Sequence, residues 1–506
     1  MFTKSLWNAC AHINDFPSLA GDLHVDVAII GGGITGISTA IELQEKGLRV
    51  AVLEALKIGG GSTSHSTGNL YYTTDKNLDE LRSKYDTETV KNIVAARSAA
   101  LNRISAHVKN YRLDCDFVRV PWYLYAADES QTKLIEKELE AGLEASTGIK
   151  EADPAHIPFK SFKAAVVNDQ AQLNPMRYVQ QLAAAVQSEN LIIHECTRVT
   201  KVENDGGLQI LHTDNASKVF AKFVVQATHT PKGIKFVHTL LGPYREYGIA
   251  CRISDQKFPQ GIFWGYYNNG EKISTRLYER GNDKFLIVVG KPHKVGQQHD
   301  NESRIRELEE FARTNFSIEE VSYRWGGQHY RPADLLPYIG KDPAEENNFI
   351  ATGFSTDGLV YGTLSGIIIA DLINGNTNQW SELFDPERRQ PLKAAKNFLK
   401  ENLNVVAQFG KNLPGVGEAD DYKDIPAGEG KIIDRKGQKI AAFKTESGDL
   451  HICSAVCTHM ACIVNWNNAE KSWDCPCHGS RFKPDGTVLE GPAFEPLKQL
   501  SEIKKM

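Results

Sequence analysis

The sequence predicts an α/β domain of the Rossmann type followed by a small all-β domain. Residues 24–55 read as strand, glycine-rich turn, helix and strand, which is the pattern of a dinucleotide-binding unit. Short alternating strands with glycine turns follow Asp421, as is typical of an antiparallel β module. Within that module, five of the nine cysteines fall between Cys453 and Cys477. This concentration indicates a metal or redox centre.

Length and charge limit the possible functions. The 506 residues are enough for two or three domains with substantial cores. The net charge of −5, with both signs mixed along the chain, gives no electrostatic case for binding nucleic acid or an anionic membrane. The sequence contains no apolar run of about 18 residues that would predict a transmembrane anchor, and its first residues lack the core of a signal peptide. We therefore expect a soluble, cytoplasmic protein.

The remaining cysteines are scattered through the first half of the chain, as is usual in a reducing compartment. We expect them to be buried small apolar side chains. They are Cys10, Cys115, Cys196 and Cys251. Cys453 is expected to lie in a strand of the all-β domain.

The first strand–turn–helix unit has the features that a bound pyrophosphate requires. Glycines let the backbone approach the phosphates, which then lie at the positive end of a helix. The second strand ends at Glu54, whose carboxylate can accept hydrogen bonds from the adenosine ribose. Because a carboxylate disfavours a 2′-phosphate, the predicted ligand is FAD or NAD rather than NADP. The predicted contacts are Gly31, Gly33, Ile34, Thr35, Gly36 and Glu54.

A later segment favours FAD. Residues 349–352 read as a strand, residues 353–358 as a glycine-bearing loop, and the helix after them ends at Asn374-Gly375. A helix N-terminus directed at the pyrimidine edge of a flavin would stabilise negative charge on the reduced ring. The pattern alone equally fits an ordinary packing unit. The flavin contacts predicted here are Gly353, Gly358 and Leu359.

About the first 375 residues resemble the D-amino-acid oxidase/glycine oxidase family of FAD-dependent amine oxidoreductases. The matching segments are the Gly31 motif, Leu173-Asn174-Pro175 at the start of a helix, the strand at 223–231 and the block from Pro337 to Ile373. The resemblance implies the amino-acid oxidase fold, with an α+β substrate cap. The predicted divisions are an oxidoreductase at 1–375, a linker at 376–420 and a C-terminal domain at 421–506. Within the oxidoreductase, the FAD-binding parts are predicted at 24–90, 165–235 and 321–375, and the substrate cap at 91–164 and 236–320.

The C-terminal domain contains two thiols and two imidazoles in two short motifs, Cys457-Thr458-His459 and Cys475-Pro476-Cys477-His478. This set describes a Rieske-type [2Fe–2S] cluster, in which two cysteines hold one iron and two histidines hold the other. The predicted ligands are Cys457, His459, Cys475 and His478. A Cys₂His₂ set also suits zinc, although zinc ribbons usually carry C-x₂₋₄-C pairs and the first pair here is C-x-H.

Roughly residues 421–500 resemble the Rieske domains of the cytochrome bc1 and b6f kind. The resemblance implies a disulfide between Cys462 and Cys477 that ties the two cluster loops together. In the respiratory proteins a tyrosine two residues after the loop serine bonds to a ligand sulfur. Here Ser480 is kept, but the tyrosine position is Phe482. Since hydrogen bonds to the sulfurs raise the potential, we expect a lower potential than in the respiratory proteins.

The substrate is less well defined, because family positions that bind a substrate carboxylate are changed. Amino-acid-oxidising members place an arginine after a W-x-G-x motif, and the matching position here is His329. Arg331 lies two residues further on, and a second arginine position is Thr356. An amine without an α-carboxylate is therefore at least as probable a substrate as a simple amino acid. The predicted catalytic residues are His329 and Tyr330.

Residues 59–69 form a glycine- and serine-rich loop that is expected near the flavin ring. The loop resembles that of dimethylglycine dehydrogenase, in which a histidine is bonded covalently to the flavin. His65 occupies the matching place, so a covalent bond is one hypothesis and noncovalent packing of the flavin is the other. The predicted contacts in this loop are Gly61, Ser62, His65, Ser66 and Thr67.

Together these features predict an FAD-dependent amine or amino-acid dehydrogenase that passes electrons through a Rieske cluster to an external carrier or quinone. The sequence also leaves three other functions to consider. Electrons could flow in reverse, from a carrier through the cluster to the flavin, or the protein could be a redox sensor. A Rieske oxygenase would need a mononuclear iron site, and no D/E-x₂-H-x₃₋₄-H run occurs among the 15 histidines.

Overall fold

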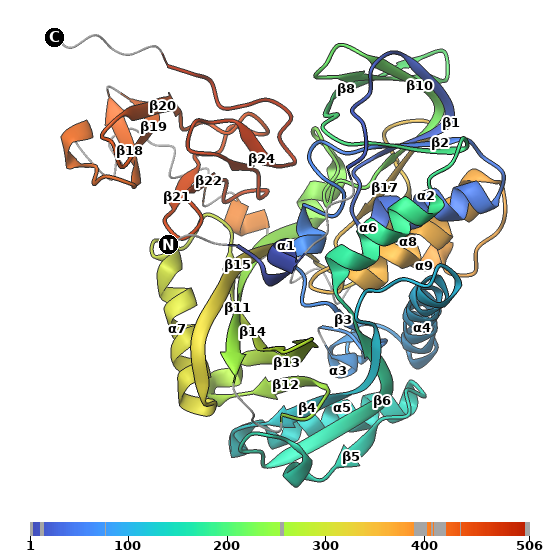
Figure 1. The fold of residues 1–506 in the computed structure, drawn as a ribbon, viewed down its shortest axis with the longest axis vertical. Coiled ribbons are helices and arrows are strands. Elements are labelled where there is room, and N and C mark those ends of the chain that lie inside the picture. The colour runs from blue at the N-terminus through green and yellow to red at the C-terminus, as the bar shows by residue number, and fades with distance from the viewer. Residues whose placement is uncertain are drawn as a thin grey trace.

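The computed structural model describes residues 4–10, 15–75, 77–253, 258–388, 402–405, 408, 421–435 and 437–500. Most of the predicted linker therefore lies outside the described residues. In Figure 1 a layered α/β domain lies at the upper right, a cap built on a large sheet lies below it, and the C-terminal domain lies at the upper left.

The α/β domain is built on an eight-stranded sheet. Six strands follow the order β16-β17-β10-β1-β2-β7, while β9 pairs with β10 and β8 pairs with β9. Its central strands pair in parallel and are largely runs of buried Val, Ile, Leu and Ala, as expected for a sheet covered on both faces. The strands are β1 (Leu23–Ile30), β2 (Val50–Leu53), β7 (Leu191–His194), β8 (Val199–Asp205), β9 (Leu208–Thr213), β10 (Lys218–Gln226), β16 (Tyr338–Lys341) and β17 (Asn348–Thr352). β17 and the helix after it confirm the strand–loop–helix segment predicted there.

Two helices, α2 (Ile34–Glu45) and α8 (Gly358–Ile373), pack closely against each other. A Cβ at Gly366 would lie 2.8 Å from the backbone of Ser38, so the close approach depends on glycine. α6 (Pro175–Val186) begins as predicted, with Asn174 as its N-cap and Pro175 in its first turn. The other helices of the described residues are α1 (Leu6–Cys10), α3 (Leu78–Arg82), α4 (Thr87–Asn110), α5 (Thr132–Glu144), α7 (Asn301–Asn315) and α9 (Ser381–Phe384).

The cap is built on a nine-stranded sheet in the order β15-β11-β14-β13-β12-β4-β6-β3, with β5 beside β6. α7 packs on β11 and β14, and α5 packs on β4 and β6. The strands are β3 (Asn69–Leu70), β4 (Val118–Ala126), β5 (Lys150–Ala152), β6 (Lys163–Gln172), β11 (Leu241–Ile253), β12 (Ile262–Tyr266), β13 (Lys272–Arg280), β14 (Asp283–Lys294) and β15 (Ile318–Pro332).

The observed division between the two parts differs from the expected one. α4, which begins before residue 91 and was expected to lie mostly in the cap, packs its apolar side chains against α8 in the core of the α/β domain. Conversely β6 and most of β15, expected among the FAD-binding parts, pair within the cap sheet. The apolar stripe of α4 and the long β11–β15 ladder explain both differences.

The C-terminal domain consists of two small antiparallel sheets, as the alternating pattern predicts. The strands are β18 (Gly430–Arg435), β19 (Gln438–Lys444), β20 (Leu450–Ser454), β21 (Asn465–Asn467), β22 (Ser472–Asp474), β23 (Arg481–Phe482) and β24 (Val488–Glu490). Trp466, Trp473 and Phe482 pack in its core. Cys453 lies buried in β20, as expected.

Two further expectations concern cysteines and the membrane. Cys115 and Cys251 are buried, but Cys196 is exposed, in a loop where its φ is +48°, so the prediction of burial was wrong for it. None of the helices in the described part of the chain is long and apolar enough to cross a membrane.

Candidate functional site

A large cavity opens at the carboxyl ends of β1 and β2, where a Rossmann-type sheet binds its ligand. Gly31 has a φ of +107°, and a Cβ there would lie 2.6 Å from the carbonyl oxygen of Ala227, so the turn requires glycine. Gly33 and the first residues of α2 line the cavity, as do Gly358 and Leu359 at the start of α8. Two helix N-termini thus face the same space, and each is suited to anionic groups.

Glu54 also lines this cavity, at the end of β2. Its carboxylate accepts hydrogen bonds from the backbone N–H of Gly32, at 2.7 Å, and of Leu56, at 2.8 Å. Burial raises the pKa of Glu54 and outweighs the lowering effect of these bonds. Each oxygen keeps a second lone pair, so the carboxylate can still accept hydrogen bonds from the ribose hydroxyl groups, as the sequence predicts.

Two cations in the cavity wall were missed by sequence reasoning. Arg198 precedes β8, and Lys232 follows β10. Burial lowers the pKa of Lys232 to about 8. Neither residue belongs to a motif, which is why no sequence signal identified them. A glycine cradle, two helix N-termini, a carboxylate and two cations fit FAD, whose pyrophosphate is a dianion.

The predicted cofactor contacts divide into two groups. All except Gly36 and Gly353 line the cavity. A Cβ at Gly36 would overlap the carbonyl of Gly31, and one at Gly353 would lie 2.9 Å from Pro332. These two glycines therefore serve the packing of the site, whereas the roles of the others as FAD contacts stay predictions.

The serine-rich loop forms a short 3₁₀ helix, η1 (Ser62–His65), at the cavity wall. His65 Nδ1 lies 2.9 Å from the carbonyl oxygen of Gly61. Because a carbonyl only accepts, Nδ1 carries the ring proton and Nε2 is the basic nitrogen. Burial lowers the pKa of His65, which favours the neutral ring. A covalent bond from His65 to the flavin stays a hypothesis.

The β11–β15 ladder has two faces with different surroundings. Tyr244 pairs with His329 and Arg245 pairs with Gln328, so opposite residues share a face. On one face, His329 and Arg331 lie beside Tyr244: Arg331 Nε donates to His329 Nε2 at 3.0 Å, and the guanidinium lies 4.1 Å from the Tyr244 ring centroid. His329 lines the flavin cavity, where the family arginine was expected.

A second cavity adjoins the first, and Glu246 and Thr356 line both. Its volume is about 500 Å³, within the range of small-molecule sites. Its walls are strongly charged, with Glu271, Lys291 and Arg331 among them. Arg331 is therefore placed in this second cavity, and Glu246 is a site residue that sequence reasoning missed.

The opposite face of the ladder contacts the C-terminal domain. The Tyr330 hydroxyl lies 3.3 Å from the carbonyl oxygens of both His478 and Gly491, and it accepts a hydrogen bond from Gln328 Nε2 at 3.0 Å. Gln328 also donates to the carbonyl of Gly479 at 2.8 Å. The Tyr330 hydroxyl is thus taken up by the domain contact, which differs from the amine-binding role expected of it.

The predicted cluster ligands come from two loops, one after β20 and one between β22 and β23. The backbone N–H groups of His459 and Met460 and the Ser480 hydroxyl donate to the Cys457 sulfur. Contact with the Cys475 thiol, together with these bonds, lowers the pKa of Cys457 to about 7 against the raising effect of burial. A lowered pKa favours the thiolate, which is the metal-binding form.

Both histidines offer Nδ1 toward this centre. The Nδ1 atoms of His459 and His478 are buried and have no hydrogen-bond partner among the described residues. The two rings lie 5.0 Å apart. Such orphaned nitrogen atoms, on the same two loops as Cys457 and Cys475, fit a Rieske cluster, in which each imidazole binds iron through one nitrogen. Ligation by these four residues stays a prediction.

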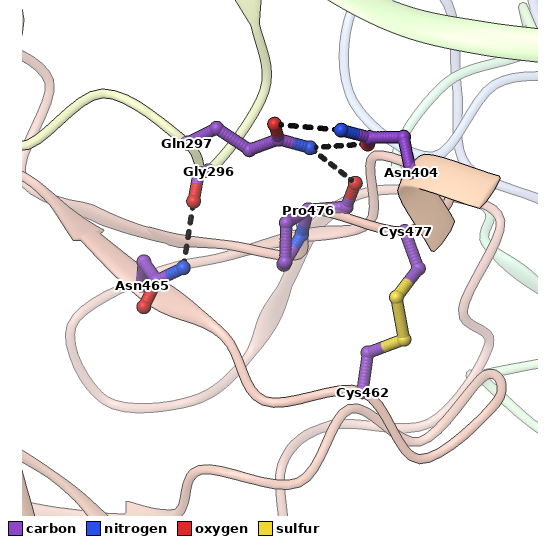
Figure 2. Close-up of a disulfide and its surroundings, with 7 residues drawn as sticks. All are labelled: Gly296, Gln297, Asn404, Cys462, Asn465, Pro476 and Cys477. Carbon is purple, nitrogen blue, oxygen red and sulfur yellow. Dashed lines mark hydrogen bonds between the residues drawn. A yellow bond between two sulfur atoms is a disulfide. The ribbon is translucent and has the colours of Figure 1, made fainter. Parts of the chain in front are cut away.

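The disulfide joins Cys462 to Cys477 and connects the two loops, as Figure 2 shows. Gln297 donates to the carbonyl of Pro476 at 3.4 Å, and Asn465 Nδ2 donates to the carbonyl of Gly296 at 2.6 Å, so the cap also contacts these loops. The sulfurs of Cys462, Cys475 and Cys477 lie within 4.8 Å of one another, but two of them form the disulfide. Only Cys475 of these three is therefore available to a metal.

The two predicted histidine ligands lie against the oxidoreductase part of the chain. His459 Nε2 lies 3.1 Å from the carbonyl oxygen of Gly233. His238, in the 3₁₀ helix η4 (Phe236–Leu240), lies with its ring centroid 4.9 Å from that of His459 and 6.1 Å from that of His478. Arg245 forms a buried ion pair with Glu470 across the same contact. The cluster edge is thus packed against the domain that holds the flavin cavity.

Comparisons with known proteins agree with this architecture. The family model "FAD dependent oxidoreductase" matches residues 26–372, and "Rieske [2Fe-2S] domain" matches residues 416–501. YhfW of Bacillus subtilis strain 168, a Rieske 2Fe-2S iron-sulfur protein by name, is 30% identical over 98% of this chain and 97% of its own. Gamma-glutamylputrescine oxidoreductase of Escherichia coli K12 is 23% identical over 75% of this chain and 90% of its own.

The structure of glycine oxidase from Geobacillus kaustophilus superposes with a TM-score of 0.58 at 18% identity, over 72% of this chain and 99% of that one. Proteins of the FAD dependent oxidoreductase family bind FAD, and Rieske domains bind a [2Fe–2S] cluster. The chain therefore belongs to the FAD-dependent oxidoreductase family and carries a Rieske [2Fe–2S] domain after its oxidoreductase domain.

Proposed function

We propose that this protein is an amine dehydrogenase that oxidises a C–N bond and passes the electrons through its Rieske domain to an external one-electron carrier or quinone. The observation that carries the proposal is the packing of the cluster edge on the flavin domain, with His459 Nε2 at 3.1 Å from the Gly233 carbonyl oxygen. When bound, FAD accepts a hydride equivalent from the substrate and the Rieske cluster carries one electron at a time.

The balance of the reaction explains the need for both domains. An amine that becomes an imine loses two electrons and two protons. A carrier that takes one electron must be reduced twice for each amine oxidised, and a cluster that carries one electron at a time can pass the two electrons on singly. Holding that site on the same chain replaces a collision between two proteins with a fixed contact.

Support for an amine comes from relatives and from the cavity. The names of gamma-glutamylputrescine oxidoreductase and glycine oxidase indicate nitrogen-bearing substrates. In this chain Glu246 lies where the two cavities meet, so its carboxylate adds negative charge that favours an ammonium group entering from the second cavity. His329 Nε2 accepts from Arg331, and an arginine stays protonated, so Nε2 is not positioned to take a proton from the substrate.

Few residues separate the flavin cavity from the loops that carry the predicted cluster ligands. Tyr330 and Gln328 line the flavin cavity and hydrogen-bond to the backbone of His478 and Gly479, in the second cluster loop. His459 contacts Gly233, next to the cavity-lining Lys232. The backbone of His478 therefore contacts a cavity-lining residue directly, and a single residue, Gly233, lies between His459 and the cavity-lining Lys232.

Anaerobic mixing with a panel of primary and secondary amines tests the proposal. A substrate should bleach the flavin absorbance first and then produce the EPR signal of the reduced cluster. In a Cys457→Ser variant, which lacks a predicted ligand, the same amine should bleach the flavin with no cluster signal. Flavin that is reduced only after a carrier has reduced the cluster would instead support electron flow in the opposite direction.

A further inference from the structure

We propose that the Rieske domain forms part of the FAD-binding site, so that FAD binding and docking of this domain stabilise each other. The observation is that Leu489, Glu490 and Gly491, at the end of β24, line the flavin cavity. They face cavity residues that precede them in sequence by more than a hundred positions, such as Lys232 and Tyr330. The proposal concerns cofactor binding and requires no amine, so it is independent of the proposed reaction.

The backbone of this segment is held directly against the side chains of the cavity wall. The Tyr330 hydroxyl lies 3.3 Å from the carbonyl oxygen of Gly491, and Lys232 Nζ donates to the carbonyl of Ala493 at 3.4 Å. A Cβ at Gly491 would lie 2.6 Å from Lys232 Nζ, so the lysine side chain packs against the backbone that follows β24. A ligand that fills the cavity therefore contacts both domains.

Glu490 brings a carboxylate to the cavity, and charged groups behind it fix its position. Arg481 Nη1 pairs with Glu490 at 2.9 Å, and Arg481 also pairs with Asp474 at 2.9 Å and Glu470 at 3.4 Å. Glu470 in turn pairs with Arg245 of β11. Burial raises the pKa of Glu490, but attraction to the two arginines outweighs it and keeps the group ionised. FAD carries hydroxyl and N–H donors that suit such an acceptor.

Thermodynamic linkage makes the coupling reciprocal. A ligand that touches both domains binds the docked arrangement more tightly than the undocked one. By the same factor, docking raises the affinity for the ligand. Contacts between the domains that do not themselves line the cavity, such as Arg245–Glu470, should therefore influence FAD binding.

The first test is hydrogen–deuterium exchange on the full-length protein, produced without flavin and with its cluster assembled. Adding FAD should slow exchange at residues 488–491 and also at residues 465–470, which contact the cap outside the cavity. Residues 430–444, in the sheet of β18 and β19, should not change. Unchanged exchange at both 488–491 and 465–470 would overturn the proposal.

The second test measures the FAD dissociation constant by flavin fluorescence in a matched pair of variants. Glu470→Gln leaves Arg245 without its anion at the domain contact, so FAD should bind at least about fivefold more weakly. Glu446→Gln, on an exposed turn of the same domain, should bind FAD like the parent. Equal dissociation constants for the two variants would contradict the coupling.

If Glu470→Gln fails to assemble its cluster, a second pair of variants with a smaller change at the domain contact can be used for the same measurement. Asn468 Oδ1 accepts the backbone N–H of Asn301 at 2.9 Å and of Glu302 at 3.3 Å, at the start of α7. Asn468→Ala should weaken FAD binding, while Asn315→Ala, at the other end of the same helix, should not. An Asn468→Ala variant with parental affinity would also refute the proposal.

Discussion

Replacing Tyr330 with phenylalanine removes one hydroxyl from the contact between the oxidoreductase and Rieske domains. That hydroxyl has one proton to donate, shared between the carbonyls of His478 and Gly491 at 3.3 Å each, and it accepts from Gln328 at 3.0 Å. Gln328 keeps a second partner in the Gly479 carbonyl. The substitution therefore costs one donated bond and leaves a buried carbonyl unsatisfied.

The lost bond contributes about 1 kcal/mol, and an unsatisfied buried acceptor adds about 1 kcal/mol or more. A total of about 2 kcal/mol corresponds to a roughly thirtyfold weaker docking equilibrium. Hydrogen exchange at residues 478–491 of the full-length protein measures this change directly. Electron arrival at the cluster after flavin reduction should slow in parallel, because it requires the docked arrangement.

Tyr422→Phe is the matched control. The Tyr422 hydroxyl is buried and has no hydrogen-bond partner among the described residues, so its removal should leave docking unchanged. A Tyr330→Phe variant with parental exchange but a raised KM for the amine would refute this reasoning. That outcome would return Tyr330 to the amine-binding role that the sequence predicted for it.

Three further predictions concern the Rieske domain. Burial raises the pKa of Glu470 but attraction to Arg245 and Arg481 lowers it to about 2, from an ordinary 4.5. Docking is therefore fully supported above pH 4.5 and weakens as the pH falls toward 2, so the protection factors at the contact, corrected for the intrinsic exchange rate at each pH, should fall, a dependence that Glu470→Gln should lack. Serine at both Cys462 and Cys477, which are 15 residues apart, should lower the unfolding free energy by about 3 kcal/mol in urea titrations, and no loss would mean that other contacts hold the loops. Phe482→Tyr should raise the cluster potential in an EPR-monitored titration, because a hydroxyl near the sulfurs stabilises the reduced state; an unchanged potential would mean that it finds no sulfur.

Local features of the fold could be predicted because their causes are local. The Gly31 turn, the Asn174 cap with Pro175, and the strand and helix around Gly353 each depend on residues within a few positions. The cluster loops were recognisable for the same reason, since Cys457 and His459 are two positions apart. In each of these patterns, residues close together in the sequence determine the local conformation.

The rest of the site depends on contacts between distant segments, and no local pattern encodes them. His459 meets Gly233 across 226 positions, and Arg245 meets Glu470 across 225. Lys232 and Glu490 carry ordinary charged side chains whose importance appears only when the two domains are packed together. The contacts of Tyr330 could not be predicted for the same reason, because its hydrogen-bond partners His478 and Gly491 belong to the other domain; its amine-binding role stays a prediction.

The β11–β15 ladder shows how one register can fix both the cavities and the domain contact. Side chains alternate between the two faces of a strand, so His329 lies on the face opposite to Gln328 and Tyr330. These two residues contact the Rieske domain and, like His329, also line the flavin cavity. On the partner strand, Arg245 faces the Rieske domain in the same way. A slip of one residue in either strand would exchange the faces and destroy both surfaces at once. His329, the predicted substrate-side residue, therefore lies between two residues that contact the Rieske domain, so a change of register would alter its position and that contact together.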